Sequence, residues 1–202
     1  MLLVLASSSP RRRRIMEDAG HVFVVRSSHV EELRFDQPEE MVVENAIRKA
    51  RAAQLEKGEL VVGADTIVVC KGEPLGKPVN REDAARMLRV QIGYPTRVIS
   101  GLSVIDTSND SEIHGLEISS VKMSGNEKAV REYIDSGLWE GKAGAFGIQD
   151  DPSITIELLW GELDNVIGMP MTLLGRILTL AGYGPGSNEV EEHVPDMEGN
   201  EG

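Results

Sequence analysis

The first fourteen residues constrain the fold most, because a strand-length apolar run there stops abruptly where a helix should start. Residues 2–6 are apolar, residues 7–9 are three serines, and Pro10 follows them. Ser9 suits the N-cap of a helix and Pro10 its first position, where the missing N–H costs nothing. The pattern therefore predicts a strand, a short serine turn and a helix.

Four arginines at residues 11–14 fill the first turn of that predicted helix. A helix N-terminus already carries partial positive charge and favours acidic side chains, so four bases there break a local rule. Natural sequences break such rules mostly where function demands it. Serine hydroxyls, backbone N–H groups and guanidinium groups at one helix end suit a phosphate chain. The alternative is a basic helix on the surface.

Length and composition indicate a soluble globular protein. The 202 residues allow one domain, or two small lobes, with a substantial core. No run approaches the roughly 18 apolar residues of a membrane span, so we expect no membrane partner. Cys70 is the single cysteine, which excludes an internal disulfide and favours a cytoplasmic protein. Inside the apolar run 67–70, this cysteine suits core packing better than nucleophilic chemistry.

The formal net charge of −12 argues against a nucleic-acid partner. Half of that charge lies in the last residues, because residues 187–202 hold six acids and no lysine or arginine. The body then carries a formal charge of −6. We expect a folded domain at residues 1–184 and a disordered acidic tail at residues 185–202, since the tail is poor in apolar residues.

Hydrophobic periodicity predicts an α/β protein in which helices cover the faces of a sheet. Helices are expected at residues 10–19, 38–57, 81–91, 127–136 and 170–181. Strands are expected near residues 22–25, 60–69, 97–105 and 113–123, with shorter ones at 145–148, 154–159 and 165–167. The turn-rich segment 107–111 should join two antiparallel strands.

Asp65 interrupts the apolar strand expected at residues 60–69. A carboxylate buried there needs a metal, a cation or hydrogen bonds, because burying it bare is costly. Gly63 nearby permits close approach of another group to the backbone. Asp65 is thus a candidate metal ligand or general base, and the alternative is a structural aspartate that caps a loop.

Two lysines are candidates for contacts with phosphate. Lys77 lies between Gly76 and Pro78 in a stiff loop, which would hold its charge in a fixed place. The loop is not a Walker A motif, which requires Ser or Thr after the lysine. Lys49 lies on the helix expected at residues 38–57. For both residues, a solvated surface lysine is the alternative.

Other polar residues suit binding less specifically. Gln149 ends a glycine-rich segment, and its amide offers both a donor and an acceptor to a nucleobase. Glu31 and Glu32 form an acidic pair that would suit a divalent cation or simply an exposed loop. The four histidines show no metal-ligand spacing.

Five motifs, in this order, resemble those of the Maf family of nucleoside triphosphate pyrophosphatases. They are Leu5-Ala-Ser-Ser-Ser-Pro-Arg-Arg12, Gly63-Ala-Asp-Thr66, Gly76-Lys-Pro78, Lys142-Ala-Gly-Ala-Phe-Gly-Ile-Gln149 and Asn165-Val-Ile-Gly-Met-Pro170. The resemblance extends from residue 2 to about residue 182. It implies an inosine-triphosphatase-like fold: a mixed, twisted sheet flanked by helices, with two lobes and a cleft between them.

The resemblance also implies a reaction, namely hydrolysis of a nucleoside triphosphate to its monophosphate and pyrophosphate with Mg²⁺ or Mn²⁺. Asp65 falls on the position of the proton acceptor, and the positions that handle phosphate are Ser9, Arg12, Lys49 and Lys77. Asp65 would also serve the metal, together with Glu31 or Glu32. Arg11, Thr66 and Gln149 are similar to residues of the branch that hydrolyses dTTP and UTP. The family resemblance further implies a homodimer.

Three positions depart from the usual family pattern, at Arg97, Ser100 and Asp164. They bear on fine specificity and loop packing rather than on the class of reaction. Two other functions are therefore kept: hydrolysis of 7-methyl-GTP or another modified nucleotide, and a nucleotide-binding regulator of cell division without turnover. The intact Asp65 and the basic residues argue against the second.

Overall fold

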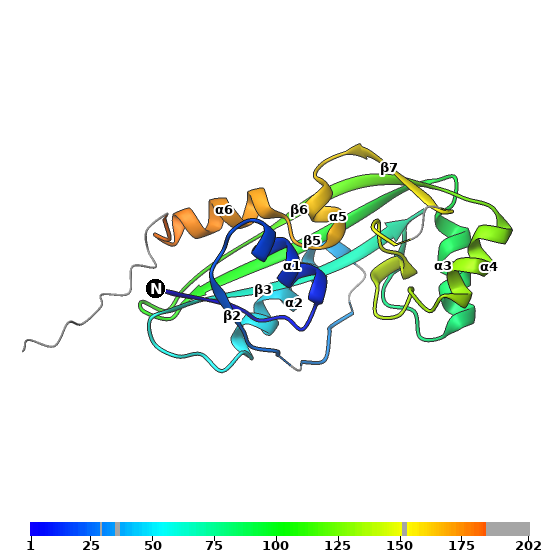
Figure 1. Cartoon of the computed structure of the whole chain (residues 1–202). Coiled ribbons are helices and arrows are strands. Elements are labelled where there is room, and N and C mark those ends of the chain that lie inside the picture. The colour runs from blue at the N-terminus through cyan, green and yellow to red at the C-terminus, as the bar shows by residue number, and fades with distance from the viewer. Residues whose placement is uncertain (29, 35–36, 151–152, 185–202) are drawn as a thin grey trace, which may run out of the picture.

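A long mixed sheet forms the centre of the computed structural model, which describes residues 1–28, 30–34, 37–150 and 153–184 (Figure 1). Its strands are β1 (Leu2–Leu5), β2 (Phe23–Val25), β3 (Glu59–Cys70), β4 (Glu73–Leu75), β5 (Pro95–Asp106), β6 (Ser111–Ser124) and β7 (Thr155–Trp160). The helices are α1 (Pro10–Asp18), α2 (Pro38–Arg51), α3 (Arg81–Gln91), α4 (Glu127–Asp135), η1 (Ala143–Ala145), α5 (Leu163–Ile167) and α6 (Met171–Leu180).

The sheet has the order β2-β1-β3-β5-β6-β7 among the described residues, and β4 pairs with β3 outside this path. Strands β1, β2 and β3 are parallel, because helices connect them, whereas β3, β5, β6 and β7 are antiparallel neighbours. The mixed α/β sheet that the sequence predicted is confirmed.

Strand β3 has a gap in its pairing on one side. β1 pairs with β3 as far as Val62, and β4 begins its pairing at Val68. Within the described part of the chain, β3 residues 63–67 therefore pair only with β5. This open edge lies in the middle of the sheet and carries Asp65 and Thr66, so polar groups reach a place that a continuous sheet would close.

One face of the sheet is covered by α2, which lies unusually close to the strands. A Cβ atom on Gly63 would lie 2.0 Å from the carbonyl oxygen of Ala46, and one on Gly101 would lie 2.4 Å from that of Val42. Only glycine permits this approach, so the close contact expected at Gly63 is confirmed and its partner is α2. The side chains of α2 consequently lie directly beside Asp65.

The opposite face carries two separate apolar clusters. The first joins α1 and α6 to one half of the sheet through Leu3, Leu5, Met16, Leu60, Val62, Leu102, Val104, Leu174 and Ile177. The second joins α3 and α4 to the other half through Val68, Cys70, Leu75, Met87, Leu88, Val98, Val121, Val130 and Tyr133. The two clusters define two lobes on one shared sheet, at opposite ends of an elongated molecule (Figure 1). Cys70 is fully buried, as expected for a core residue.

The structure differs from the expected elements in four places. Residues 165–167 lie in helix α5 rather than a strand, and Gly168 ends that helix with a φ of 108°. Residues 145–148 are not a strand, because Gly144 and Ala145 have φ values of 66° and 62°. Helix α2 stops at Arg51 instead of residue 57, and Gln54 has a φ of 53° just beyond it. The short strand β4 was not expected.

Among the described residues, no helix has the length and apolar character needed to cross a membrane. The acidic tail expected at residues 185–202 lies outside the described residues, so the division at residue 184 stays a prediction.

Candidate active site

A cleft of about 1100 Å³ lies between the two lobes. Four segments distant in sequence line it: the serine turn with the start of α1, the open edge of β3, the loop around Lys77, and the segment 140–150. Residues of α2 and residues 32–34 also line it. The cleft thus brings all five family-like motifs to one place, the fifth through Val166, Ile167 and Gly168.

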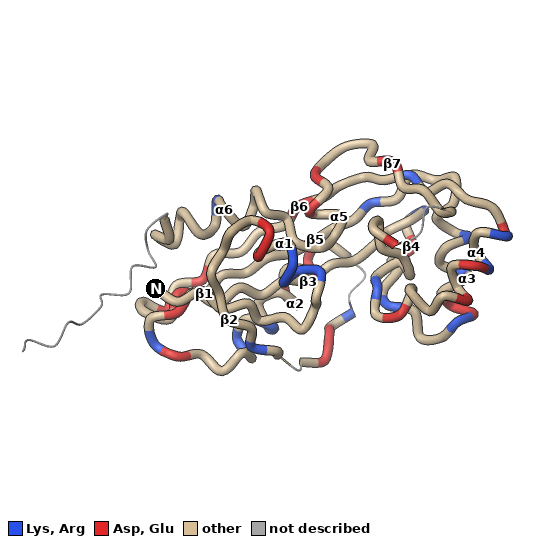
Figure 2. The backbone as a smooth tube through the Cα atoms, in the orientation of Figure 1, with Lys and Arg blue, Asp and Glu red and all other residues tan. Residues whose placement is uncertain are grey.

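The start of α1 has the predicted capping geometry. Ser9 is the N-cap and its hydroxyl accepts a hydrogen bond from the backbone N–H of Arg12 at 3.5 Å, with Pro10 in the first turn. Basic residues gather at this helix start beside β3 (Figure 2). Because the first turn holds no acid, the helix dipole and the guanidinium groups add the same sign of charge facing the cleft.

The four arginines divide into two pairs. Arg11 and Arg12 line the cleft. Arg13 and Arg14 lie on the surface in ion pairs with acids one turn further along α1, at 2.7 Å to Glu17 and 3.6 Å to Asp18 respectively. Only the first pair is therefore available to a ligand in the cleft.

Arg12 ties three parts of the site together. Its Nε donates to the carbonyl of Gly168 at 2.9 Å, and its two Nη atoms donate to the hydroxyls of Ser7 at 3.3 Å and Thr66 at 3.1 Å. Burial lowers the pKa of Arg12, while the charge of Asp65 acts in the opposite direction. A cation held mainly by neutral partners in a half-buried place suits an incoming anion.

Asp65 and Thr66 point to opposite faces of the sheet, as successive strand residues do. The Thr66 hydroxyl lies 3.0 Å from that of Ser100 on β5, on the side of Arg12. Asp65 faces α2 and is 6% exposed. Both side chains nevertheless line the same cleft. They reach it because this part of β3, among the described residues, has a paired strand on its β5 side only.

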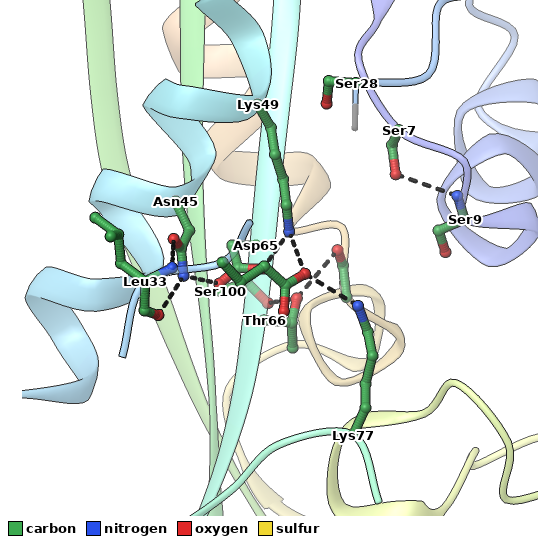
Figure 3. A network of polar contacts seen from close by, with 12 residues as sticks. Ser7, Ser9, Ser28, Leu33, Asn45, Lys49, Asp65, Thr66, Lys77 and Ser100 are labelled. Atoms are coloured by element: carbon green, nitrogen blue, oxygen red, sulfur yellow. Dashed lines mark hydrogen bonds and ion pairs between the residues drawn. The ribbon is translucent and has the colours of Figure 1, made fainter. Parts of the chain in front are cut away.

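Two lysines and two carboxylates alternate in a chain beside β3 (Figure 3). Lys49 Nζ, from α2, lies 2.6 Å from Asp65 Oδ1 and 2.8 Å from Glu32 Oε1. Lys77 Nζ, from the loop after β4, lies 3.0 Å from the same Glu32 oxygen. The structure thus brings Lys49, Lys77, Asp65 and one member of the acidic pair together.

Glu32 is the member of the acidic pair that faces the site. Burial alone would raise its pKa, but hydrogen bonds and charges from Lys49 and Lys77 outweigh burial and lower it to about 2. Glu32 is therefore a stable carboxylate at neutral pH. Glu31 is exposed and, among the described residues, is not part of the cleft lining. Of the two glutamates, Glu32 is therefore the one that lies in the cleft, and its role toward a metal stays a prediction.

Asn45 holds Asp65 from the other side, and sequence reasoning missed it. Its Nδ2 lies 3.1 Å from Asp65 Oδ2, and its amide also bonds the backbone of Leu33. The available signal was an asparagine inside a helix, which is an unfavourable position, four residues before Lys49 and so on the same helix face.

Gln149 lies at the rim of the cleft and is exposed. The segment that carries it is fixed by Asp150, whose Oδ2 accepts hydrogen bonds from Tyr133 at 2.6 Å, from the backbone of Gly147 at 3.0 Å and from Lys142. Burial raises the pKa of Tyr133, with Asp150 acting in the same direction, so the phenol stays a donor. Sequence reasoning missed both Tyr133 and Asp150.

The donor set fits a divalent cation that is shared with a phosphate ligand. Among the described residues, no group of three or more His, Cys, Asp or Glu side chains gathers as a complete metal site. Asp65 and Glu32 nevertheless lie on the two sides of one ammonium group. Mg²⁺ is commonly held by one or two carboxylates, with substrate phosphates and waters filling the other positions.

The fold and the cleft define a two-lobed α/β protein with an acid flanked by cations on an open strand edge. The fold is similar to that of the Ham1 protein of Staphylococcus aureus, with a TM-score of 0.53 and 14% identity over 90% of this chain and 100% of that one. At that identity the likeness concerns the fold alone.

The Maf-like protein family model matches residues 2–181, and the chain belongs to the Maf family. A relative from Dictyoglomus thermophilum named dTTP/UTP pyrophosphatase is 38% identical over 90% of this chain and 96% of its own length. Relatives with the same name from Symbiobacterium thermophilum and Pyrococcus horikoshii are 38% and 36% identical, over 90% and 92% of this chain and 94% and 99% of their own lengths.

Proposed function

We infer that this chain is a nucleoside triphosphate pyrophosphatase that hydrolyses dTTP and UTP to the monophosphate and pyrophosphate. The observation that carries the proposal is the carboxylate of Asp65, which is nearly buried yet lines the cleft among Lys49, Lys77 and Arg12. The consistent names of relatives that match nearly the whole chain support the choice of substrates.

Asp65 is the proposed general base. It takes a proton from a water molecule, whose oxygen forms a bond to the α-phosphorus as the bond from that phosphorus to the bridging oxygen breaks. The electron pair leaves with pyrophosphate. Lys49 holds one oxygen of Asp65 before substrate enters, so the carboxylate is already oriented.

The cations of the cleft are proposed to hold the triphosphate. Ser9 and Arg12 at the start of α1, together with Lys49 and Lys77, offset about four negative charges and the charge that develops on the leaving pyrophosphate. Lys77 is the more exposed of the two lysines, and within the described part of the chain its ion pair is with Glu32. It is therefore free to turn toward phosphate without uncovering a buried acid.

Asp65 and Glu32 are the residues that would hold a divalent cation, Mg²⁺ or Mn²⁺. When bound, the cation would supply positive charge to the phosphate oxygens. The lowered pKa of Glu32 supports this role, because it keeps the carboxylate charged at neutral pH.

Arg11, Thr66 and Gln149 are proposed to select the pyrimidine base. All three line the cleft, and they come from α1, β3 and the rim segment respectively. Arginine and an amide together offer donors and an acceptor to the edge of thymine or uracil. The two alternatives are hydrolysis of 7-methyl-GTP and binding without turnover. The following experiment distinguishes both from the proposed function.

The experiment offers dTTP, UTP, CTP, 7-methyl-GTP and ITP to the purified full chain with Mg²⁺, and measures pyrophosphate and monophosphate separately. Release of pyrophosphate from dTTP and UTP in preference to the others supports the proposal. Orthophosphate as the first product would overturn the reaction, and preference for 7-methyl-GTP would overturn only the choice of base. Binding without any product would favour the regulator.

We also propose that the enzyme is cytoplasmic, that it acts as a homodimer and that it has no nucleic-acid partner. The homodimer follows from the family resemblance, and light scattering coupled to size-exclusion chromatography tests it. A mass near 22.0 kDa would indicate a monomer.

A further inference from the structure

We propose that Asn45 is a positioning residue that orients Asp65 and fixes the segment bearing Glu32, so that both carboxylates are set by one buried amide. The inference deepens the proposed function and rests on it. Asn45 lies on α2 and is 2% exposed, so its three polar contacts are made without competition from solvent.

The amide of Asn45 uses its acceptor and both donors. Its Oδ1 accepts the backbone N–H of Leu33 at 2.8 Å, and its Nδ2 donates to the Leu33 carbonyl and to Asp65 Oδ2, both at 3.1 Å (Figure 3). Turning the amide over would set its oxygen against a carbonyl and a carboxylate. Only one orientation satisfies every group, so the neighbours lock the side chain.

The two partner residues of Asn45 belong to different parts of the proposed reaction. Asp65 is held at Oδ2 by Asn45 and at Oδ1 by Lys49, which lies one helical turn later on α2. The carboxylate plane is therefore fixed from one rigid helix. Leu33 directly follows Glu32, so pinning both backbone groups of Leu33 places Glu32 within reach of Lys49.

A purely structural role would predict a different outcome. A buried amide that only joins two segments costs stability when removed, but the folded molecules that remain keep their turnover rate. A positioning residue lowers turnover in molecules that are fully folded. Residues that orient a metal ligand typically contribute about 10- to 100-fold in activity or metal affinity.

The test replaces Asn45 by Asp, which keeps the shape but exchanges the donors for a negative charge beside Asp65, and compares it with the same change at Asn165. Asn165 is a matched control because it is fully buried and its Nδ2 bonds Val98 and Ser119 rather than a charged residue of the cleft. Thermal melting followed by circular dichroism gives the folded fraction of each variant. Turnover is then expressed per folded molecule.

For N45D we expect kcat with dTTP to fall about 10- to 100-fold, while KM changes less than about threefold. Mn²⁺ binding to the complex with non-hydrolysable α,β-imido-dUTP, followed by electron paramagnetic resonance, should weaken about 10-fold or more. For N165D we expect a lower melting temperature with unchanged kcat per folded molecule. N45S removes the amide without adding a charge, so it should show the same direction of change and also serves if N45D does not fold.

Unchanged kcat and Mn²⁺ affinity in a folded Asn45 variant would overturn the inference. So would equal losses in N45D and N165D, because these would reflect buried amides in general. A wild-type chain that hydrolyses no nucleotide would instead overturn the proposed function, so the two failures are distinguishable.

Discussion

Lys49 Nζ lies 2.6 Å from Asp65 Oδ1, and the same ammonium lies 2.8 Å from Glu32 Oε1. A single lysine thus occupies the space between the two carboxylates that would share a divalent cation. Lys49 must release at least one of them before a cation binds both, and the incoming triphosphate offers it a new partner. Metal and nucleotide are therefore expected to enter together.

Replacement of Lys49 by Met tests this competition. We expect Mn²⁺ binding in the absence of nucleotide to tighten about 10-fold, because two carboxylates lose the ammonium between them. Hydrolysis of dTTP should fall about 100-fold, since a cation is lost beside the phosphates. Isothermal titration calorimetry measures the first effect, and the exposed Lys128→Met is the control. Unchanged Mn²⁺ affinity would exclude the competition.

Asp65→Asn removes the proposed base while keeping its size. We expect kcat for dTTP to fall about 10²- to 10⁴-fold with KM nearly unchanged, because the group that accepts the proton of water is lost. Pyrophosphate release under saturating Mg²⁺ measures the effect, and a melting curve shows that the variant is folded. A variant with wild-type turnover would rule out Asp65 as the base.

Gly63→Ala tests the close approach of α2 to β3. The new Cβ would lie 2.0 Å from the carbonyl oxygen of Ala46, which is helix backbone and cannot move alone. We expect the free energy of unfolding to fall by about 3 kcal/mol or more. Gly175→Ala in α6 is the control, because no heavy atom among the described residues lies within 4 Å of the added methyl.

Gly175→Ala should raise the free energy of unfolding by about 0.5 to 1 kcal/mol, since alanine favours helix more than glycine does. Urea titration measures both variants. Similar values for the two would contradict the close contact at Gly63.

Glu59 and Arg26 predict an acid-dependent loss of stability. The Glu59 carboxylate is 4% exposed and meets both Nη atoms of Arg26 at 2.6 Å. The hydrogen bonds from Arg26 lower the pKa of Glu59, while burial acts in the opposite direction. A carboxylate with a lower pKa in the folded chain stabilises the fold above its unfolded-state pKa, about 4.3, and loses this contribution as the pH falls.

For Glu59→Gln we expect a loss of about 1 to 3 kcal/mol in the free energy of unfolding at neutral pH. The difference from wild type should shrink as the pH falls from about 6 to 3, because Glu59 becomes protonated in the wild type. Urea titrations across this range measure it. The matched control is Glu56→Gln, since Glu56 meets the same Arg26 at 3.3 Å but is 72% exposed. Equal losses for the two variants would contradict the prediction.

Most elements could be predicted from the sequence because apolar periodicity indicates which residues are buried. This pattern is clearest in long elements, where it repeats several times. Helix α3 matches its expected bounds, and the long strands β3, β5 and β6 extend only slightly beyond theirs. The errors fall in short segments. At Gly144 and Ala145 the backbone is left-handed, and no hydrophobic pattern reports a backbone dihedral. In α5, an apolar pair of residues fits a strand or a helix equally well.

The site was predicted in part because its unusual residues break local rules: bases at a helix N-terminus, and an acid in an apolar strand. The residues that contact each of them could not be predicted from the sequence. Asn45, Tyr133 and Asp150 contribute by contacts across the fold, and single-sequence patterns do not encode which residues meet. Which of Glu31 and Glu32 faces the cleft likewise depends on the direction of one loop.

The bond from Arg12 Nε to the carbonyl of Gly168 spans 156 positions in the sequence. Arg12 is made early in synthesis, whereas its carbonyl partner arrives only after the whole sheet has been produced. A nascent chain that stops before residue 168 has the basic helix start but not the backbone that orients it. Completion of the cleft therefore waits until residue 168, after the last strand of the sheet, has been made. Products truncated before it should bind triphosphate poorly even where their first strands have paired.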